Sequence, residues 1–141
     1  MAEARFEKVS RSDTPLYGPR KMVLCGFGRD AQPRFKTVLE MAGLGDLPLV
    51  WVSARDRTAP LAELFERPAD SGEGVGSALP RALIMAGITE NELHRLMDIC
   101  RRTGMRNALW AALTPTSESW PLETLLAELS AERRQFDARP K

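Results

Sequence analysis

The sequence predicts an α+β protein in which one β-α-β-α unit occurs twice around a four-stranded sheet. Three observations support this prediction: four short apolar runs with strand character, amphipathic segments between them, and self-similarity at a spacing of 61 residues. With 141 residues the chain is long enough to bury one hydrophobic core without metals or disulfides.

The self-similarity follows the order of the chain. The matched positions are a strand (Met22–Phe27 with Leu83–Ile88), a glycine that ends a helix (Gly43 with Gly104), a tryptophan (Trp51 with Trp110, after a two-residue insertion) and a proline (Pro60 with Pro121). We therefore expect a single domain, 21–136, made of the repeats 22–66 and 82–126 with a connector at 67–81. Residues 1–20 and 137–141 lack periodicity, and we expect them to be mobile.

Each half begins with a buried strand, 22–27 or 82–87, that ends at a glycine. An amphipathic helix follows, with its apolar residues at helical spacing. In the first half this stripe comprises Phe35, Val38, Leu39 and Ala42, after Asp30 as the N-cap. In the second half it comprises Leu93, Leu96, Met97 and Cys100, after a capping box formed by Thr89 and Glu92.

A second apolar strand, 48–53 or 108–113, comes next and carries a tryptophan. A closing helix then follows in each half. Thr58 and Ser119 are its expected N-caps, with Pro60 and Pro121 in the first turns. The glycine-rich and serine-rich run after Pro68 predicts a flexible connector.

Two sheet arrangements satisfy this order of elements. A duplicated β-α-β unit favours a ferredoxin-like sheet, with antiparallel strands and helices packed on one face. The near-continuous apolar character of all four strands favours the alternative, an α/β parallel sheet covered by helices on both faces. The ferredoxin-like sheet is the favoured arrangement.

Composition excludes several classes of protein. Hydrophobic residues make up 43% and charged residues 28%, and the formal net charge is only +1. A near-neutral chain has no overall field that attracts nucleic acid or an anionic membrane. The apolar runs are far shorter than the roughly 18 residues of a membrane span, and the first residues lack a signal-peptide pattern. We expect a cytoplasmic protein with neither nucleic acid nor membrane as a partner.

The familiar motifs of catalysis, metal binding and cofactor binding are absent. Gly26-Phe27-Gly28 follows a strand, but it lacks the third glycine of a dinucleotide loop, so a tight turn is the simpler interpretation. Cys25 and Cys100 lie in apolar segments as buried thiols, and two thiols with one charged-face histidine, His94, cannot form a tetrahedral metal site. We expect no catalytic residue, no metal and no cofactor.

One stretch of the second half resembles a known family. Leu83–Thr89 form an apolar strand and turn, and an acidic amphipathic helix follows. Leu113-Thr114-Pro115-Thr116 and then Trp120 come after the next strand. This order is similar to a bacterial family known as domain of unknown function 3783, over about residues 82–133. The resemblance implies a soluble bacterial protein of uncharacterised activity, and it supplies no catalytic residues.

Two functions remain open. The lack of convergent acid, base, nucleophile and metal ligands favours a non-catalytic protein-interaction or regulatory module that binds a protein partner or itself. The alternative is a small-ligand-binding or enzyme domain with its site in loops 87–92 and 114–120, because ligands favour the carboxyl ends of strands. The residues expected on this ligand or partner surface are Thr89, Thr114, Thr116, Ser117, Glu118 and Trp120.

Overall fold

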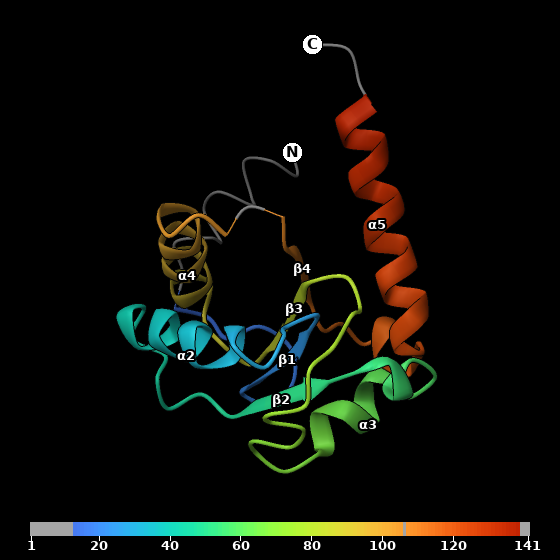
Figure 1. Ribbon diagram of the computed structural model, residues 1–141, viewed down its shortest axis with the longest axis horizontal. Coiled ribbons are helices and arrows are strands. Elements are labelled where there is room, and N and C mark those ends of the chain that lie inside the picture. Colours follow the sequence, from blue (N-terminus) through green and yellow to red (C-terminus); the bar gives the residue numbers. More distant parts are fainter. Residues whose placement is uncertain (1–12, 106, 139–141) are drawn as a thin grey trace.

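A four-stranded sheet lies between two layers of helices in the computed structural model, which describes residues 13–105 and 107–138 (Figure 1). The strands and helices are β1 Lys21–Cys25, α2 Ala31–Met41, β2 Leu49–Val52, α3 Leu61–Glu66, β3 Ala82–Ala86, α4 Glu90–Arg102, β4 Leu109–Ala112 and α5 Leu122–Ala138, with the short 3-10 helices η1 Ala54–Asp56 and η2 Ser117–Ser119. The predicted strands and helices are therefore present in the predicted order.

The strand order β2-β1-β3-β4 confirms the predicted α+β class and the two β-α-β units. Inside each half the two strands are parallel neighbours, β1 with β2 and β3 with β4. The halves meet in the centre, where β1 and β3 are antiparallel and Val23 lies opposite Ile84. The sheet is thus mixed. It contains the adjacent parallel pairs expected for the α/β alternative, and one antiparallel pair joins the halves. No strand of one β-α-β unit lies between the two strands of the other.

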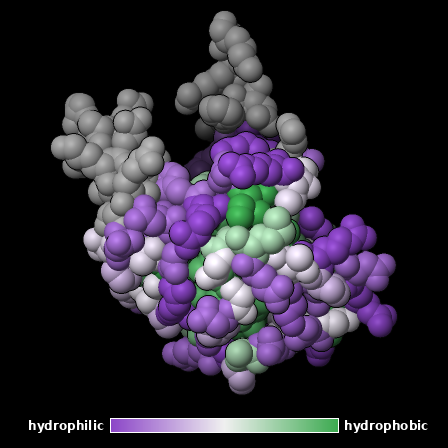
Figure 2. Space-filling model, turned by 90° about the vertical axis from the view of Figure 1, so that its left-hand side faces the viewer, coloured by the Kyte–Doolittle hydropathy of each residue, from purple (hydrophilic) through white to green (hydrophobic). Residues whose placement is uncertain are grey.

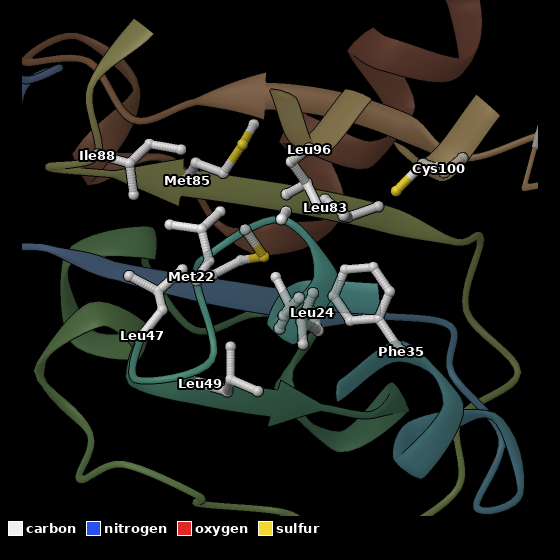
Figure 3. Close-up of a cluster of buried hydrophobic side chains, with 14 of the residues drawn as sticks. Met22, Leu24, Phe35, Leu47, Leu49, Leu83, Met85, Ile88, Leu96 and Cys100 are labelled. Carbon is white, nitrogen blue, oxygen red and sulfur yellow. The ribbon is translucent and has the colours of Figure 1, made fainter. Parts of the chain in front are cut away.

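Helices cover both faces of the sheet, with α2 and α4 on one side and α3 and α5 on the other (Figure 1). Alternate side chains of the strands point to opposite faces, so each face has its own core. Met22, Leu24, Leu83 and Met85 pack with Leu96 under α2 and α4 (Figure 3). Burial on both faces explains why the strands are apolar along nearly their whole length, with Lys21 at the start of β1 as the charged exception.

The helix ends follow the sequence signals in part. Thr89 and Glu92 form the predicted capping box, and Gly43 and Gly104 end α2 and α4 with φ of +79° and +92°. Asp30 occupies the N-cap position of α2, but its side chain makes no capping hydrogen bond.

The predicted N-caps of the closing helices, Thr58 and Ser119, are wrong. Pro60 is the N-cap of α3, and it is extended and bridged to Pro121 before α5. The Leu61 N–H donates to the Trp120 carbonyl at 3.0 Å, and the Leu122 N–H donates to the Ala59 carbonyl at 2.9 Å. Backbone carbonyls of the other half therefore replace side-chain caps.

The connector and the N-terminal segment are tied to the sheet. The Trp51 N–H donates to the Ser71 carbonyl at 2.8 Å, so the connector runs along the outer edge of β2. Buried Gln32 accepts from the Gly74 N–H at 2.7 Å and donates to the Val75 carbonyl at 3.1 Å. Of the termini expected to be mobile, residues 1–12 and 139–141 lie outside the described residues, whereas 137 and 138 belong to α5.

The outer surface of α2 and α4 agrees with amphipathic helices. The side of the molecule that carries them is mostly hydrophilic, with a small hydrophobic area between the polar regions (Figure 2). None of the helices within the described ranges has the length and apolar character needed to cross a membrane.

Candidate interaction surface

The predicted site residues gather where β3 and β4 end, and there the chain covers part of its own surface. The segment from Pro15 to Arg20 crosses this end of the sheet. The Leu16 N–H donates to the Ile88 carbonyl at 2.8 Å, and the Gly87 N–H donates to the Tyr17 carbonyl at 3.2 Å. Sequence periodicity could not reveal this contact, because it joins residues about 70 positions apart through backbone groups that every residue carries.

Thr89 begins α4 and has a structural role there. Its hydroxyl accepts a hydrogen bond from the Glu92 N–H at 3.1 Å, and the Glu92 carboxylate accepts from the Thr89 N–H at 2.9 Å. The same carboxylate accepts hydrogen bonds from both terminal nitrogens of Arg20, at 2.7 and 2.8 Å. The Arg20 hydrogen bonds, opposed by partial burial and aided by Thr89, lower the pKa of Glu92 to about 2.

Thr114 and Ser117 bond to each other and shape the turn after β4. The Thr114 hydroxyl donates to the Ser117 hydroxyl at 3.0 Å and accepts from the Ser117 N–H at 2.9 Å. Ser117 is buried, whereas Thr114 and Thr116 are exposed on the outside of the turn.

Glu118 and Trp120 also contact other parts of the chain. The Glu118 carboxylate accepts a hydrogen bond from the Tyr17 hydroxyl at 2.7 Å, and this hydrogen bond raises the pKa of Tyr17 above its usual value. Trp120 is half-buried and packs against the core under α3 and α5. The structure thus brings the six predicted residues to one end of the sheet, with Thr89 at α4 and the other five between β4 and α5. Thr114 and Thr116 are the most accessible of them.

The outer edge of β4 adjoins these threonines. The Leu109 N–H donates to the Arg81 carbonyl just before β3 at 2.9 Å, and the Leu113 N–H donates to the Met85 carbonyl of β3 at 2.8 Å. The alternating N–H groups of Trp110 and Ala112 therefore point away from β3. No strand or bridge in the described part of the chain pairs with this edge. The sequence does not reveal this edge, because its exposure depends on which strands pair and on where the connector runs.

The edge of β2 is different, and the contrast defines the candidate surface. β2 is completely buried, and Asp70 and Ser71 cover its outer edge by backbone hydrogen bonds. β4 is only half-buried, and Ala112 is exposed. Arg133 of α5 donates to the Ala108 carbonyl just before β4 at 3.2 Å, but the strand itself has no charged side chain. Such an edge strand is the part of a sheet on which another extended chain can pair.

The two thiols are buried away from solvent. Cys25 and Cys100 are both buried, and burial raises the pKa of Cys25 to about 12 and that of Cys100 to about 11. Such thiols carry almost no thiolate at neutral pH. Over residues 13–105 and 107–138, no group of three or more His, Cys, Asp and Glu side chains is arranged to hold a metal ion.

The fold and this surface define a class, a two-unit α+β domain in which, among the residues that the structure describes, one sheet edge is covered and the other has no pairing strand. Residues 81–136, from the start of β3 into α5, match the family model described as "Domain of unknown function (DUF3783)". This match confirms the resemblance expected for residues 82–133. No curated protein and no solved structure matches the chain.

Proposed function

We propose that the protein is a non-catalytic interaction module that associates with a second copy of itself through the outer edge of β4. The observation that carries this proposal is the difference between the two sheet edges. The chain covers β2 with its own connector, whereas β4 presents the N–H groups of Trp110 and Ala112 without a pairing strand among the described residues.

A second copy suits this edge for reasons of symmetry and charge. Two antiparallel β4 strands related by a twofold axis bond reciprocally, because residue i of one copy meets residue j of the other and the reverse. β4 is Leu-Trp-Ala-Ala and carries no charge that would repel its copy. Pairing would join both sheets across the axis, with the exposed Thr114 and Thr116 at the rim of the contact.

The alternative function, a small-ligand or enzyme site in loops 87–92 and 114–120, has less support. Thr89, Ser117 and Glu118 each bond within the chain, and Pro15–Arg20 cover this end of the sheet. Burial and raised thiol pKa values make Cys25 and Cys100 poor candidates for a catalytic nucleophile.

We also propose that the protein is cytoplasmic and bacterial and that it arose by duplication. Two free, buried cysteines suit a reducing compartment. The reciprocal Leu61–Trp120 and Leu122–Ala59 hydrogen bonds support the duplication, because corresponding residues exchange roles across the junction.

Light scattering coupled to size exclusion tests the self-association. Because β4 is short, we expect a weak dimer with a Kd of about 10 to 1,000 μM, weaker than interfaces of the standard ~1,600 Å². Ala112→Pro removes an outward N–H, and Ala112→Lys places like charges near the axis, so both should give monomers.

Thr124→Lys, on the exposed side of α5, adds the same charge away from the edge and should leave the dimer intact. Thermal unfolding of each variant shows that the fold is retained. A wild-type protein that remains monomeric up to about 1 mM would refute self-association through β4. Dimers that persist in both Ala112 variants would place the interface elsewhere.

A further inference from the structure

A second surface lies at the opposite end of the sheet, where β1 ends. The Gly28–Asp30 turn, the first turn of α2 and the residue before β3 surround an open cavity of about 810 Å³. The residues that line it are Gly28, Arg29, Asp30, Ala31, Arg34, Gly76 and Arg81. Gln32 holds the connector beside this cavity through its bonds to Gly74 and Val75.

The cavity is positively charged, with three arginines against the single carboxylate of Asp30. Within the described residues, Arg29 and Arg34 take part in no ion pair or side-chain hydrogen bond. Arg81 is oriented by the protein: its guanidinium lies 4.4 Å from the centre of the Phe27 ring, and its Nε donates weakly to the Gly26 carbonyl at 3.4 Å. Cations without internal partners are available for a ligand.

Arg81 has a counterpart in the other half of the molecule, Arg20. Each arginine directly precedes the first strand of its half. The backbone of Arg81 packs against Gly26, and that of Arg20 packs against Gly87, with φ of +78° and +72° at these glycines. A Cβ atom on Gly87 would lie 2.5 Å from the Arg20 Cα. The close contact between an arginine backbone and the opposing turn therefore requires glycine at positions 26 and 87.

The counterpart shows what such an arginine binds at the start of a helix. Arg20 holds the Glu92 carboxylate by two hydrogen bonds of 2.7 and 2.8 Å, and this carboxylate also accepts the Thr89 N–H. The carboxylate is thus bound in a bidentate manner by the Arg20 guanidinium and also by a backbone N–H at the start of α4. Paired, charge-assisted hydrogen bonds of this kind are among the stronger ones in proteins.

The start of α2 has the facing arginine, Arg81, without the carboxylate. The 61-residue shift places Ala31 at the position of Glu92 and Gly28 at that of Thr89. Ala31 and Arg81 line the same cavity, and no side chain caps α2. Arg29 adds positive charge where the second half has Glu90. Arg34 corresponds to Arg95, but Arg95 donates to the Ala42 carbonyl whereas Arg34 lines the cavity.

We propose that this cavity binds the carboxylate or phosphate group of a small molecule, held by Arg81, Arg29 and Arg34. The bound oxyanion occupies the place that the Glu92 carboxylate takes in the other half. A volume of about 810 Å³ is sufficient for a metabolite-sized ligand. The site is independent of the β4 edge, which belongs to the second half.

Amide chemical shifts of the full-length protein, titrated with inorganic phosphate and separately with succinate at constant ionic strength, test the site. We expect the Gly28, Arg29 and Gly76 signals to shift and saturate with at least one of the two anions, and sodium chloride at equal ionic strength to leave them in place. The tighter of the two anions identifies the charged group of the ligand. No saturating shift with either anion would overturn the proposal.

Variants distinguish this site from general attraction to arginine. Arg81→Gln should weaken binding about tenfold or more, whereas Arg102→Gln, at an exposed arginine paired with Asp98 on α4, should change it less than about twofold. Ala31→Glu supplies an internal carboxylate; it should abolish binding and raise the melting temperature, while Ala31→Gln should retain binding. If Ala31→Glu binds phosphate or succinate like the wild type, the oxyanion does not occupy the proposed place.

Discussion

The ion pair between Arg20 and Glu92 joins the N-terminal segment to α4, and its removal should be measurable. Glu92→Gln retains a side-chain oxygen that can accept the Thr89 N–H, because glutamine also suits this position of a capping box. The substitution therefore removes the charge and leaves most of the helix cap. Any loss of stability reports mainly on the bond with Arg20.

The magnitude follows from the pKa of Glu92. Hydrogen bonds from Arg20 first, then from Thr89, lower it from 4.5 to about 2, which sets an upper limit of about 3 kcal/mol. Because the Arg20 side chain is 42% exposed, solvent screening reduces the expected loss to about 1–2 kcal/mol. A carboxylate with a lowered pKa stabilises the fold above pH 4.5, and this stabilisation disappears as the pH falls towards 2.

Urea unfolding of the wild type and Glu92→Gln at neutral and acidic pH measures this contribution. We expect the difference in unfolding free energy to be largest near pH 7 and to shrink below about pH 4. Arg20→Gln should reproduce most of the loss, and the double variant should add little to it. A difference below about 0.3 kcal/mol at pH 7, or one that does not change with pH, would refute the assignment.

Two further predictions concern the turns and the thiols. Gly26→Ala should destabilise the fold by more than about 2 kcal/mol in thermal unfolding, because the new Cβ would lie 2.5 Å from the Leu79 carbonyl oxygen at a φ of +78°. Gly104→Ala, where φ is +92° and the space is open, should lose only about 1–2 kcal/mol of stability. Equal losses in the two variants would contradict the close approach at Gly26. Cys25 and Cys100 should react with a thiol reagent only after unfolding, and rapid labelling of the folded protein would show that they are accessible.

The local elements could be predicted because their signals are local. Thr89 and Glu92 are three residues apart in one capping box, and Gly43 and Gly104 follow the apolar stripes that they end. The proline signals gave the wrong N-caps, because Pro60 and Pro121 pair across the two halves and supply neighbouring carbonyl acceptors. This pairing depends on the tertiary fold.

The sheet order and the binding surfaces could not be predicted, because they depend on contacts between distant residues. Four apolar strands are compatible with several pairings, and only the packed structure places β1 against β3 and leaves β4 at an edge. Arg81 is an ordinary arginine in the sequence; it becomes a candidate ligand only when compared with Arg20, which has a carboxylate partner. In the sequence Gln32 has the pattern of an exposed polar helix residue, yet in the structure it is buried beneath the connector.

Hydrogen exchange of the β4 amides tests self-association most directly, because it reports on the groups that would pair. The Trp110 and Ala112 N–H groups should exchange more slowly as the protein concentration rises from about 10 μM to 1 mM. The Leu113 N–H, which donates to the Met85 carbonyl at 2.8 Å, provides the internal reference and should stay protected throughout. Exchange of Trp110 and Ala112 that is fast and independent of concentration, with Leu113 still protected, would contradict pairing of two copies through β4.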